Sequence, residues 1–192
     1  RRREALAQLL DRPVGEAAHL RVHRVAALEG VLRAEDLLVE EGHQSEELQQ
    51  LVLQRRGGEE QLRPLAKRVP FKLMVPTVLE RNSSPSTTKG ARMYWLKKGE
   101  KAVRLVFATG GGEYWGVQES SWEDAPVLGD KSFRHVLKDG RTYDFYYNGA
   151  KLHMVVLHAN GASYWVVNTL LDSLSNETMI AIAKGLKPLT TG

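Results

Sequence analysis

The chain has 192 residues, enough for one domain with an appendage and for a core that needs no covalent staples. It contains no cysteine, which excludes disulfides, zinc–thiolate sites, iron–sulfur clusters and thiol nucleophiles. The net charge of +4 is mild, and so small a basic excess is typical of solubility rather than of nucleic-acid binding.

Residues 1–68 differ in composition from the rest of the chain. Every Phe, Trp and Tyr lies at or after Phe71, whereas the earlier segment is rich in Leu, Ala, Glu, Gln and Arg, which favour helix. Apolar spacing predicts four short helices: up to Asp11, over 14–30, over 34–41, and from Ser45 to a break at "RRGGEE". Helices this short need a partner. We therefore predict a helical appendage over 1–68 that packs on itself, on the unit over 69–192, or on a second chain.

From residue 69 the pattern becomes that of β-strands. Strands are predicted over 71–79, 91–98, 101–109, 113–119, 132–137, 141–147, 151–158 and 163–170, with loops over 81–90 and 122–131. The dipeptides Asp139-Gly140, Asn148-Gly149 and Asn160-Gly161 are strong hairpin signals. Residues 90–170 therefore predict an antiparallel meander of about six strands.

A last helix is predicted after the strands. Ser175 suits its N-cap, Leu174 and Met179 suit a hydrophobic staple across that cap, and Gly185 suits its end. One amphipathic helix after a meander packs across the apolar face of the sheet. The predicted fold class is α+β.

The polar residues do not form a recognisable catalytic or metal-binding motif. His19 and His23 lack a third zinc ligand nearby, and His153 and His158 face opposite sides of one strand. The segment "GGGEYWG" predicts a hairpin turn, because it lacks the Lys-Ser/Thr ending of a phosphate-binding loop. Neither Ser120 nor its neighbour lies in a nucleophile elbow. We expect no catalytic residue, metal or cofactor in this chain.

Adjacent aromatic residues in "EYWG" and "YYNG" indicate that one ring of each pair points away from the core. Such rings can form a platform for sugars, lipids or bases. The alternative is that both sheet faces are covered, one by the last helix and the other by the N-terminal helices. The candidate ligand contacts are the aromatic residues Tyr114, Trp115, Trp122, Tyr146 and Tyr147, with Lys97, Lys98, Arg104 and Lys151 for phosphate groups.

Three segments, "GEYWGVQESSW", "YYNGAKLHMV" and "YWVVNTLLDSLSNETMIAIAKGL", carry a family resemblance. Over residues 69–189 the chain resembles the module that follows the catalytic domain in some actinobacterial LytR-CpsA-Psr proteins. Those are cell-envelope enzymes that transfer glycopolymers from polyprenyl-phosphate carriers onto peptidoglycan. Residues 1–68 are too short for the enzymatic domain and lack its pattern, so no catalytic residue carries over.

The resemblance implies a non-catalytic accessory module, outside the cytoplasm, that contacts a glycopolymer, a lipid carrier or a partner protein. Three alternatives stay open. The chain is the tail of a glycopolymer–peptidoglycan transferase, a nucleic-acid-binding domain that uses the same aromatic and basic residues, or an assembly module that self-associates through its N-terminal helices. Neither a transmembrane segment nor a signal peptide is predicted in the chain, because Gln8 and Asp11 interrupt its first apolar stretch. Without export, the location would be cytoplasmic.

Overall fold

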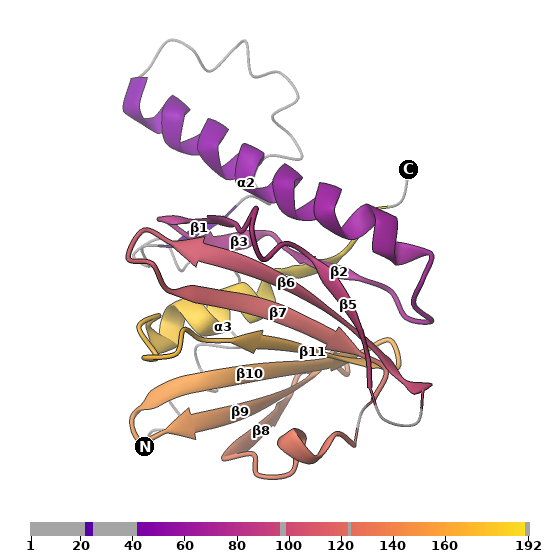
Figure 1. The fold of residues 1–192 in the computed structure, drawn as a ribbon. Helices are drawn as coiled ribbons and strands as arrows, with labels where there is room; N and C mark the ends of the chain where they lie inside the picture. The colour runs from indigo at the N-terminus through magenta and orange to yellow at the C-terminus, as the bar shows by residue number, and fades with distance from the viewer. Residues whose placement is uncertain (1–21, 25–41, 97–98, 123, 191–192) are drawn as a thin grey trace.

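The computed structural model describes residues 22–24, 42–96, 99–122 and 124–190, with side chains from residue 52 onward. An antiparallel sheet of eight strands forms its centre (Figure 1). Its strands are β4 (Ser83–Pro85), β5 (Arg92–Trp95), β6 (Lys101–Thr109), β7 (Tyr114–Ser120), β8 (Phe133–Val136), β9 (Thr142–Asn148), β10 (Lys151–Ala159) and β11 (Ala162–Val167). The predicted α+β class with antiparallel strands is confirmed.

The strand order departs from a simple meander at one place. Neighbours follow the order β4-β6-β7-β11-β10-β9-β8, and β5 pairs with β6 alongside β4. After β7 the chain crosses through residues 121–132, which include the 3-10 turn η3 (Pro126–Leu128), and enters β8 at the far edge. Strands β8 to β11 then return as a meander, so β11 pairs with β7 and places Val167 opposite Gly116. The meander therefore consists of β8 to β11. Its last strand, β11, pairs with β7 and so joins the meander to the β6–β7 hairpin.

A two-residue turn fixes the register between β10 and β11. Asn160 and Gly161 both have positive φ, 54° and 68°, a combination that matches the twist of a two-residue hairpin. The turn pairs Ala159 with Ala162 and His158 with Ser163. Directly paired residues project from the same face of a sheet, so the side chains of His158 and Ser163 are neighbours.

Two short antiparallel pairs lie outside the main sheet. β2 (Met74–Pro76) pairs with β12 (Leu186–Pro188), and β1 (Val22–Arg24) pairs with β3 (Val78–Glu80). The predicted helix over 14–30 is wrong at β1, because backbone pairing with β3 overrides the helical spacing there. The remainder of that helix, and the helices predicted before Asp11 and over 34–41, lie outside the described residues.

The segment predicted as one strand over 71–79 is split at Thr77. The backbone N–H and the Oγ1 hydroxyl of Thr77 both donate to the carbonyl of Gly185, at 2.9 and 2.7 Å. This interruption separates β2 from β3. The polar segment over 81–90, predicted as loop, contains β4, because its backbone pairs with the last residues of β6.

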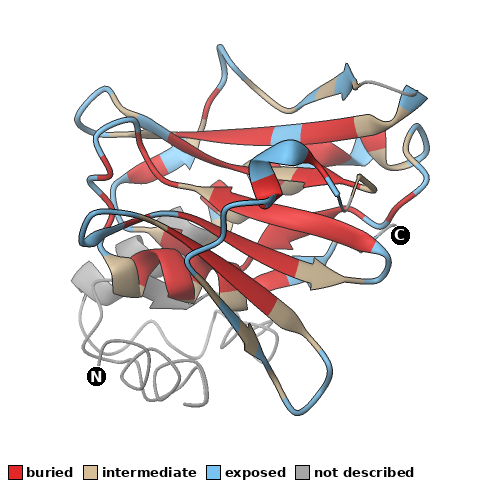
Figure 2. Ribbon diagram, turned by 90° about the horizontal axis from the view of Figure 1, so that it is seen from below, coloured by how far each residue is buried: buried red, intermediate tan, exposed pale blue. Residues whose placement is uncertain are grey.

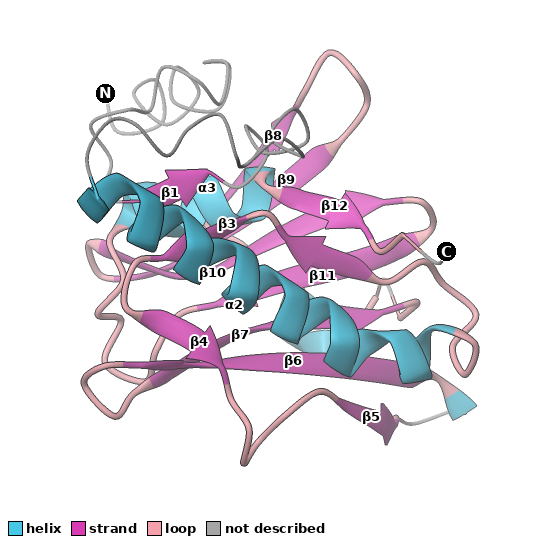
Figure 3. Cartoon of the chain, turned by 90° about the horizontal axis from the view of Figure 1, so that it is seen from above, coloured by secondary structure: helices cyan, strands magenta, loops and turns pink. Residues whose placement is uncertain are grey.

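Helix α2 (Gly42–Ala66) runs through the predicted break at "RRGGEE". Both glycines of that stretch face the sheet closely. A Cβ atom on Gly58 would lie 3.4 Å from Leu105 Cδ2, and one on Gly57 would lie 3.4 Å from Pro85 Cγ. The predicted break is therefore wrong, because the packing of α2 on β4 and β6 outweighs the low helix propensity of the two glycines. Figure 3 shows α2 lying obliquely across the sheet.

Helix α3 (Asn176–Lys184) confirms the predicted last helix. The Ser175 hydroxyl accepts a hydrogen bond from the Thr178 backbone N–H at 3.2 Å, as an N-cap does. Leu174 and Met179 are buried on either side of that cap. The helix ends at Gly185, where a Cβ would lie only 2.8 Å from Val78 Cγ2, so no larger residue fits without movement.

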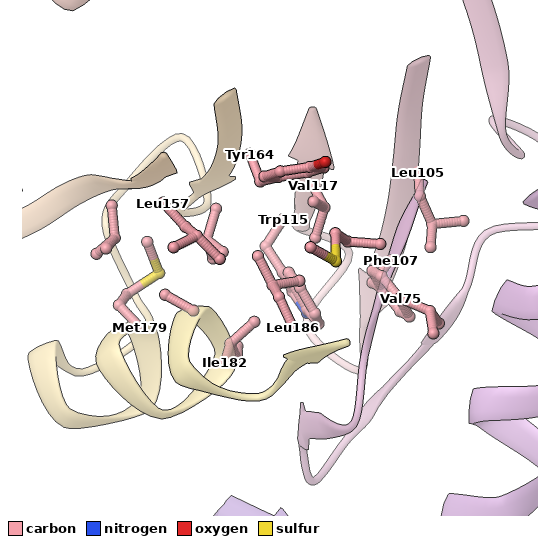
Figure 4. Close-up of a cluster of buried hydrophobic side chains, with 14 of the residues drawn as sticks. Val75, Leu105, Phe107, Trp115, Val117, Leu157, Tyr164, Met179, Ile182 and Leu186 are labelled. Atoms are coloured by element: carbon pink, nitrogen blue, oxygen red, sulfur yellow. The ribbon is translucent and has the colours of Figure 1, made fainter. Parts of the chain in front are cut away.

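Both helices cover the same face of the sheet. Leu62 and Leu65 of α2 and Met179 and Ile182 of α3 belong to one buried cluster with β6, β7, β10 and β11 (Figure 4). The predicted boundary at residue 68 therefore falls inside one continuous core. We call this side of the sheet the inner face. None of the described helices is both long and apolar enough to cross a membrane.

The opposite side, which we call the outer face, is covered over only part of its width. The crossing loop with η3 lies over β9, β10 and β11 (Figure 2). It closes a second, smaller cluster made of Ala125, Leu128, Tyr146, Met154, Val156 and Trp165. The alternative in which N-terminal helices cover the second face is wrong for α2, because a loop takes that place and α2 lies on the inner face.

Candidate functional site

The predicted platform begins with Tyr114 and Trp115, which face opposite sides of β7. Tyr114 projects from the outer face and is exposed, whereas Trp115 is only 2 % exposed. The Trp115 ring stacks on Phe107 of β6, with centroids 4.2 Å apart and planes 7° from parallel. The prediction that Trp115 points outward is wrong, because it occupies the inner-face position of its strand and fills the core.

The second aromatic pair, Tyr146 and Tyr147, also has no exposed outward ring. Tyr146 lies on the outer face but is buried beneath the crossing loop, and its hydroxyl donates to the Leu128 carbonyl at 3.0 Å. Burial and the nearby Asp144 carboxylate raise the pKa of Tyr146 to about 12. Tyr147 is half-buried against the inner cluster, and Trp122 is half-buried against the outer one. The prediction of an outward Tyr146 is therefore wrong, because a loop covers it.

The predicted cations fall into three groups. Arg104 is exposed on the outer face, opposite Gln118 of β7. Lys151 is exposed at the start of β10, where its ammonium donates to the Asp172 carbonyl at 3.1 Å. Lys97 and Lys98 lie outside the described residues. Arg104 and Lys151 do not form one cluster, because β7 and β11 separate their strands.

Tyr114 and Arg104 nevertheless share the outer face with three further exposed residues. Lys89 places its ammonium 3.4 Å from the centre of the Tyr114 ring, a cation–π contact. Arg92 of β5 pairs directly with Arg104, and Tyr94 lies two residues further along the same face. We call this set the outer strip, and its members are Lys89, Arg92, Tyr94, Arg104 and Tyr114.

Two arginines directly opposite each other give the outer strip its electrostatic character. Arg92 and Arg104 are both exposed, and like charges at paired positions of a sheet repel. Arg92 donates to the Thr88 carbonyl at 3.1 Å, and Arg104 makes no ion pair with any described residue. A guanidinium pair of this kind is suited to an anion with several oxygen acceptors, such as a phosphate group.

Sequence reasoning missed three members of the outer strip. Lys89 lies in a polar loop whose position over Tyr114 depends on the pairing of β4 with β6. Arg92 and Tyr94 lie on β5, whose register against β6 could not be assigned from sequence. The adjacent Tyr94 and Trp95 in "MYW" carried the same signal as the two aromatic pairs that were chosen.

A second polar cluster crosses the outer face on strands β8 to β11. The buried Asp144 carboxylate accepts two hydrogen bonds from Arg134, at 2.6 and 2.7 Å, and lies 3.0 Å from His158 Nε2. The other ring nitrogen of His158, Nδ1, lies 3.1 Å from Ser163 Oγ. Serine, histidine and aspartate thus form a hydrogen-bonded series on three neighbouring strands, which the two-residue turn after β10 aligns.

This series resembles a hydrolytic triad in composition but not in its surroundings. Ser163 is fully buried, so its hydroxyl is not presented to a substrate. Burial alone would raise the pKa of Asp144, but hydrogen bonds from Arg134 and His158 outweigh burial and hold that pKa below its ordinary value. The bidentate Arg134 pair already neutralises the carboxylate. We interpret the cluster as a structural network that ties β8 to β11.

One further carboxyl group lies in the core. Glu119 of β7 is fully buried on the inner face, and its Oε2 accepts from the Met74 backbone N–H at 2.7 Å. Burial raises the pKa of Glu119 well above its ordinary value, and the Met74 hydrogen bond opposes that shift only in part. The group has no route to solvent in this arrangement, which favours a structural role.

The described residues contain no cluster of three or more side chains that could hold a metal ion. His153 and His158, considered as a pair from sequence, each bind a different aspartate. His153 Nδ1 lies 2.8 Å from Asp172 Oδ1, and His158 contacts Asp144. His19 lies outside the described residues, as does the side chain of His23.

The outer strip gathers exposed cations and rings on a single face of the sheet. It retains Tyr114 and Arg104 from the sequence prediction and adds three neighbours. Comparison of the chain with protein-family models, with curated proteins and with solved structures found no significant match.

Proposed function

We propose that this chain is a non-catalytic binding module of the bacterial cell envelope, located outside the cytoplasm, that holds a phosphate-bearing glycopolymer or its lipid-phosphate carrier. The resemblance of residues 69–189 to the accessory module of LytR-CpsA-Psr proteins motivates the envelope setting. The chemistry of the outer strip supports the phosphate-bearing ligand.

The directly paired Arg92 and Arg104 are the observation that carries the proposal. Two exposed guanidinium groups on neighbouring strands repel each other until an anion lies between them. A phosphate offers acceptor oxygens to both forks at once, and hydrogen bonds between charged partners are the stronger kind. The pair therefore favours a phosphate group over a neutral sugar alone.

The aromatic members of the strip supply a second kind of contact. Tyr114 and Tyr94 expose ring surface on the same face as the arginines. A ring can lie against the apolar face of a sugar, and its hydroxyl can hydrogen-bond to the sugar's edge. Alternating sugar and phosphate units would thus meet alternating rings and cations along β5, β6 and β7.

The test is a binding titration of the full chain with four probes: farnesyl phosphate, a synthetic poly(glycerol phosphate), peptidoglycan fragments and a single-stranded oligonucleotide. We expect the first two to bind. The double variant Arg92→Gln with Arg104→Gln should weaken that binding about tenfold or more, since a charge-assisted hydrogen bond contributes about 1.5–3 kcal/mol. Backbone NMR shifts should cluster on β5, β6 and β7.

Arg56→Gln is the matched control, because Arg56 is an exposed arginine on α2, away from the strip. Equal affinity of the double variant and the wild type for both phosphate probes would contradict the proposal. Tight binding of the oligonucleotide alone, with affinity that falls steeply as salt rises, would favour the nucleic-acid alternative. Stronger binding of farnesyl phosphate would identify the lipid carrier as the ligand. Stronger binding of poly(glycerol phosphate) would identify the glycopolymer.

The same surface would serve a chain that forms the tail of a glycopolymer–peptidoglycan transferase. In that setting the outer strip would retain polymer near a catalytic domain located elsewhere. The binding experiment applies unchanged, because it measures the strip and not the transfer reaction.

A further inference from the structure

The loop between β11 and α3 presents two adjacent leucines to solvent. Leu170 is 91 % exposed and Leu171 is 77 % exposed, the highest values among the described large apolar side chains. Single exposed apolar residues are ordinary on protein surfaces, but two consecutive leucines at this exposure are not explained by packing.

Hydrogen bonds on both sides of the leucines fix the shape of this loop. Before them, the Asn168 side chain donates to the carbonyls of Leu152 and Leu174, at 2.8 and 3.1 Å. The Asn168 Oδ1 also accepts from the backbone N–H groups of Thr169 and Leu174. The Thr169 and Ser173 hydroxyls lie 2.7 Å apart across the base of the turn. The two leucines therefore lie at the tip of a turn whose two ends are joined by hydrogen bonds.

The buried Asp172 anchors the other side of the turn. Its carboxylate accepts from Asn148 Nδ2 at 3.2 Å and lies 2.8 Å from His153 Nδ1, and its carbonyl accepts from the Lys151 ammonium. Its φ of 50° lies in the left-handed region, which aspartate tolerates better than most residues. Polar groups therefore hold the turn from beneath while its apolar tip faces solvent.

The side chains around the tip are small, and the exposed lysines at this end of the sheet are basic, whereas its glutamates are half-buried. The loop follows β11 at the sheet end where β6 stops, β7 begins and β9 turns into β10. The neighbouring turns contain Gly110 to Gly112 and Gly149-Ala150, which carry no bulky side chains. Lys151 is exposed beside the tip, and Lys89 with Tyr114 lies at the same end of the sheet, near the half-buried Glu113.

From these observations we infer that Leu170 and Leu171 insert into the interfacial region of an anionic lipid bilayer. A protruding pair of leucines offers too little area for a stable protein partner, which needs about 800 Å² on each side. A bilayer needs no complementary groove, only apolar side chains that reach below the headgroups. Exposed lysines and a tyrosine at the same end suit anionic headgroups and the membrane–water boundary.

The inference does not depend on the proposed ligand of the outer strip. The leucine tip and the Arg92–Arg104 pair use different side chains, and each can be removed without touching the other. A chain that fails to bind phosphate polymers but binds vesicles would retain the membrane inference and lose the proposed function. A chain that binds phosphate polymers but not vesicles would retain the proposed function and lose the membrane inference.

The first experiment measures co-sedimentation of the full chain with vesicles. We expect binding to vesicles rich in phosphatidylglycerol and little binding to pure phosphatidylcholine. The double variant Leu170→Ser with Leu171→Ser should lower the partition coefficient about tenfold or more, since each leucine loses the transfer of its side chain out of water. Leu53→Ser is the matched control, because Leu53 is 67 % exposed on α2. Equal partition of the double variant and wild type would overturn the inference.

The second experiment uses the absence of cysteine from the sequence. Leu170→Cys and Val136→Cys each give one site for an environment-sensitive dye, and Val136 is 60 % exposed at the opposite end of the sheet. Anionic vesicles should shift the emission of the dye at position 170 to the blue and leave that at position 136 unchanged. A shift at position 170 that depends on protein concentration without vesicles would overturn the inference in favour of a second copy of the chain.

Discussion

Glu119 occupies an inner-face position that an apolar side chain would ordinarily fill. It follows Trp115 and Val117 on the same side of β7 and pairs with Val103 and Tyr164 on the neighbouring strands. One carboxyl oxygen holds the Met74 backbone N–H, which joins β2 to the end of the main sheet. A carboxyl group at this position contributes less hydrophobic stabilisation than an apolar side chain would, but its hydrogen bond links β2 to the main sheet.

The pKa of Glu119 makes the stability of the protein depend on pH. Because burial raises the pKa of the folded state above the value of about 4.3 in the unfolded chain, the folded state holds a proton that the unfolded state releases. Stability should therefore fall as pH rises above that value, by up to about 1.4 kcal/mol per pH unit until the folded pKa is passed. Glu119→Gln should remove this slope.

Urea unfolding at pH 5, 6.5 and 8 measures the effect. Glu60→Gln serves as the control, because Glu60 is an exposed carboxylate on α2 and should retain the wild-type profile. Parallel profiles for Glu119→Gln and the wild type would show that Glu119 does not titrate with unfolding.

At the scale of elements, α2 packs against the sheet through two glycines, Gly57 and Gly58. Gly57 and Gly58 let the helix approach β4 and β6 closely, although glycine in a helix costs about 1 kcal/mol relative to alanine. The helix offsets this cost by burying Leu62 and Leu65 in the common core. The space beside Gly57 and Gly58 admits a methyl group at ordinary contact distance, so larger side chains are what the packing of α2 limits.

Substitutions at Gly58 separate the two effects. A methyl group there would meet Leu105 at ordinary van der Waals distance, so Gly58→Ala should stabilise the fold by about 0.5–1 kcal/mol. Gly58→Leu should push α2 away and destabilise it by about 1–3 kcal/mol. Denaturant unfolding measures both, and Arg56→Leu on the exposed side should change little. A neutral Gly58→Leu would contradict the close approach of α2 to β6.

At the scale of the whole molecule, one core joins α2, the sheet and α3. Residues far apart in sequence, such as Leu62 and Met179, belong to the same buried cluster. The predicted division at residue 68 followed a real change in composition, since the aromatic residues all come later. Composition does not show which side chains meet in space, and α2 contributes leucines where later elements contribute rings.

Truncation tests this continuity. Removal of α2 uncovers Leu105 and Phe107, so a chain of residues 69–192 should bind a hydrophobic dye and lose about 3 kcal/mol or more of stability. A chain of residues 42–192 is the matched comparison, because it retains α2. Equal stability of the two truncated chains would mean that α2 is an independent appendage.

Local signals account for what the sequence predicted well. Asn160-Gly161 sets its own turn, and Ser175 caps α3 through a hydrogen bond three residues away. The apolar alternation of Trp115 and Val117 also distinguishes the inner side of β7 from Tyr114. Choosing both rings of that pair as contacts ignored a signal that was present.

Long-range packing accounts for what could not be predicted. The burial of Tyr146 depends on a crossing loop from another part of the chain, and its partner there is the Leu128 carbonyl. The paired Arg92 and Arg104 depend on the register of β5 with β6, which no turn dipeptide between them specifies. The leucine tip was visible as "TLLD", but its exposure depends on the bonds of Asp172 to β9 and β10.

The pairing of β12 with β2 has a consequence for the order of events during synthesis. Residues 186–188 align with 74–76, the Gly185 carbonyl holds Thr77, and the Leu189 N–H donates to the Leu73 carbonyl at 2.8 Å. The early strand at 74–76 therefore waits for a partner that the ribosome makes more than one hundred residues later. Until residue 189 emerges, the backbone of β2 lacks its strand partner, and its apolar side chains are less fully buried than in the complete fold.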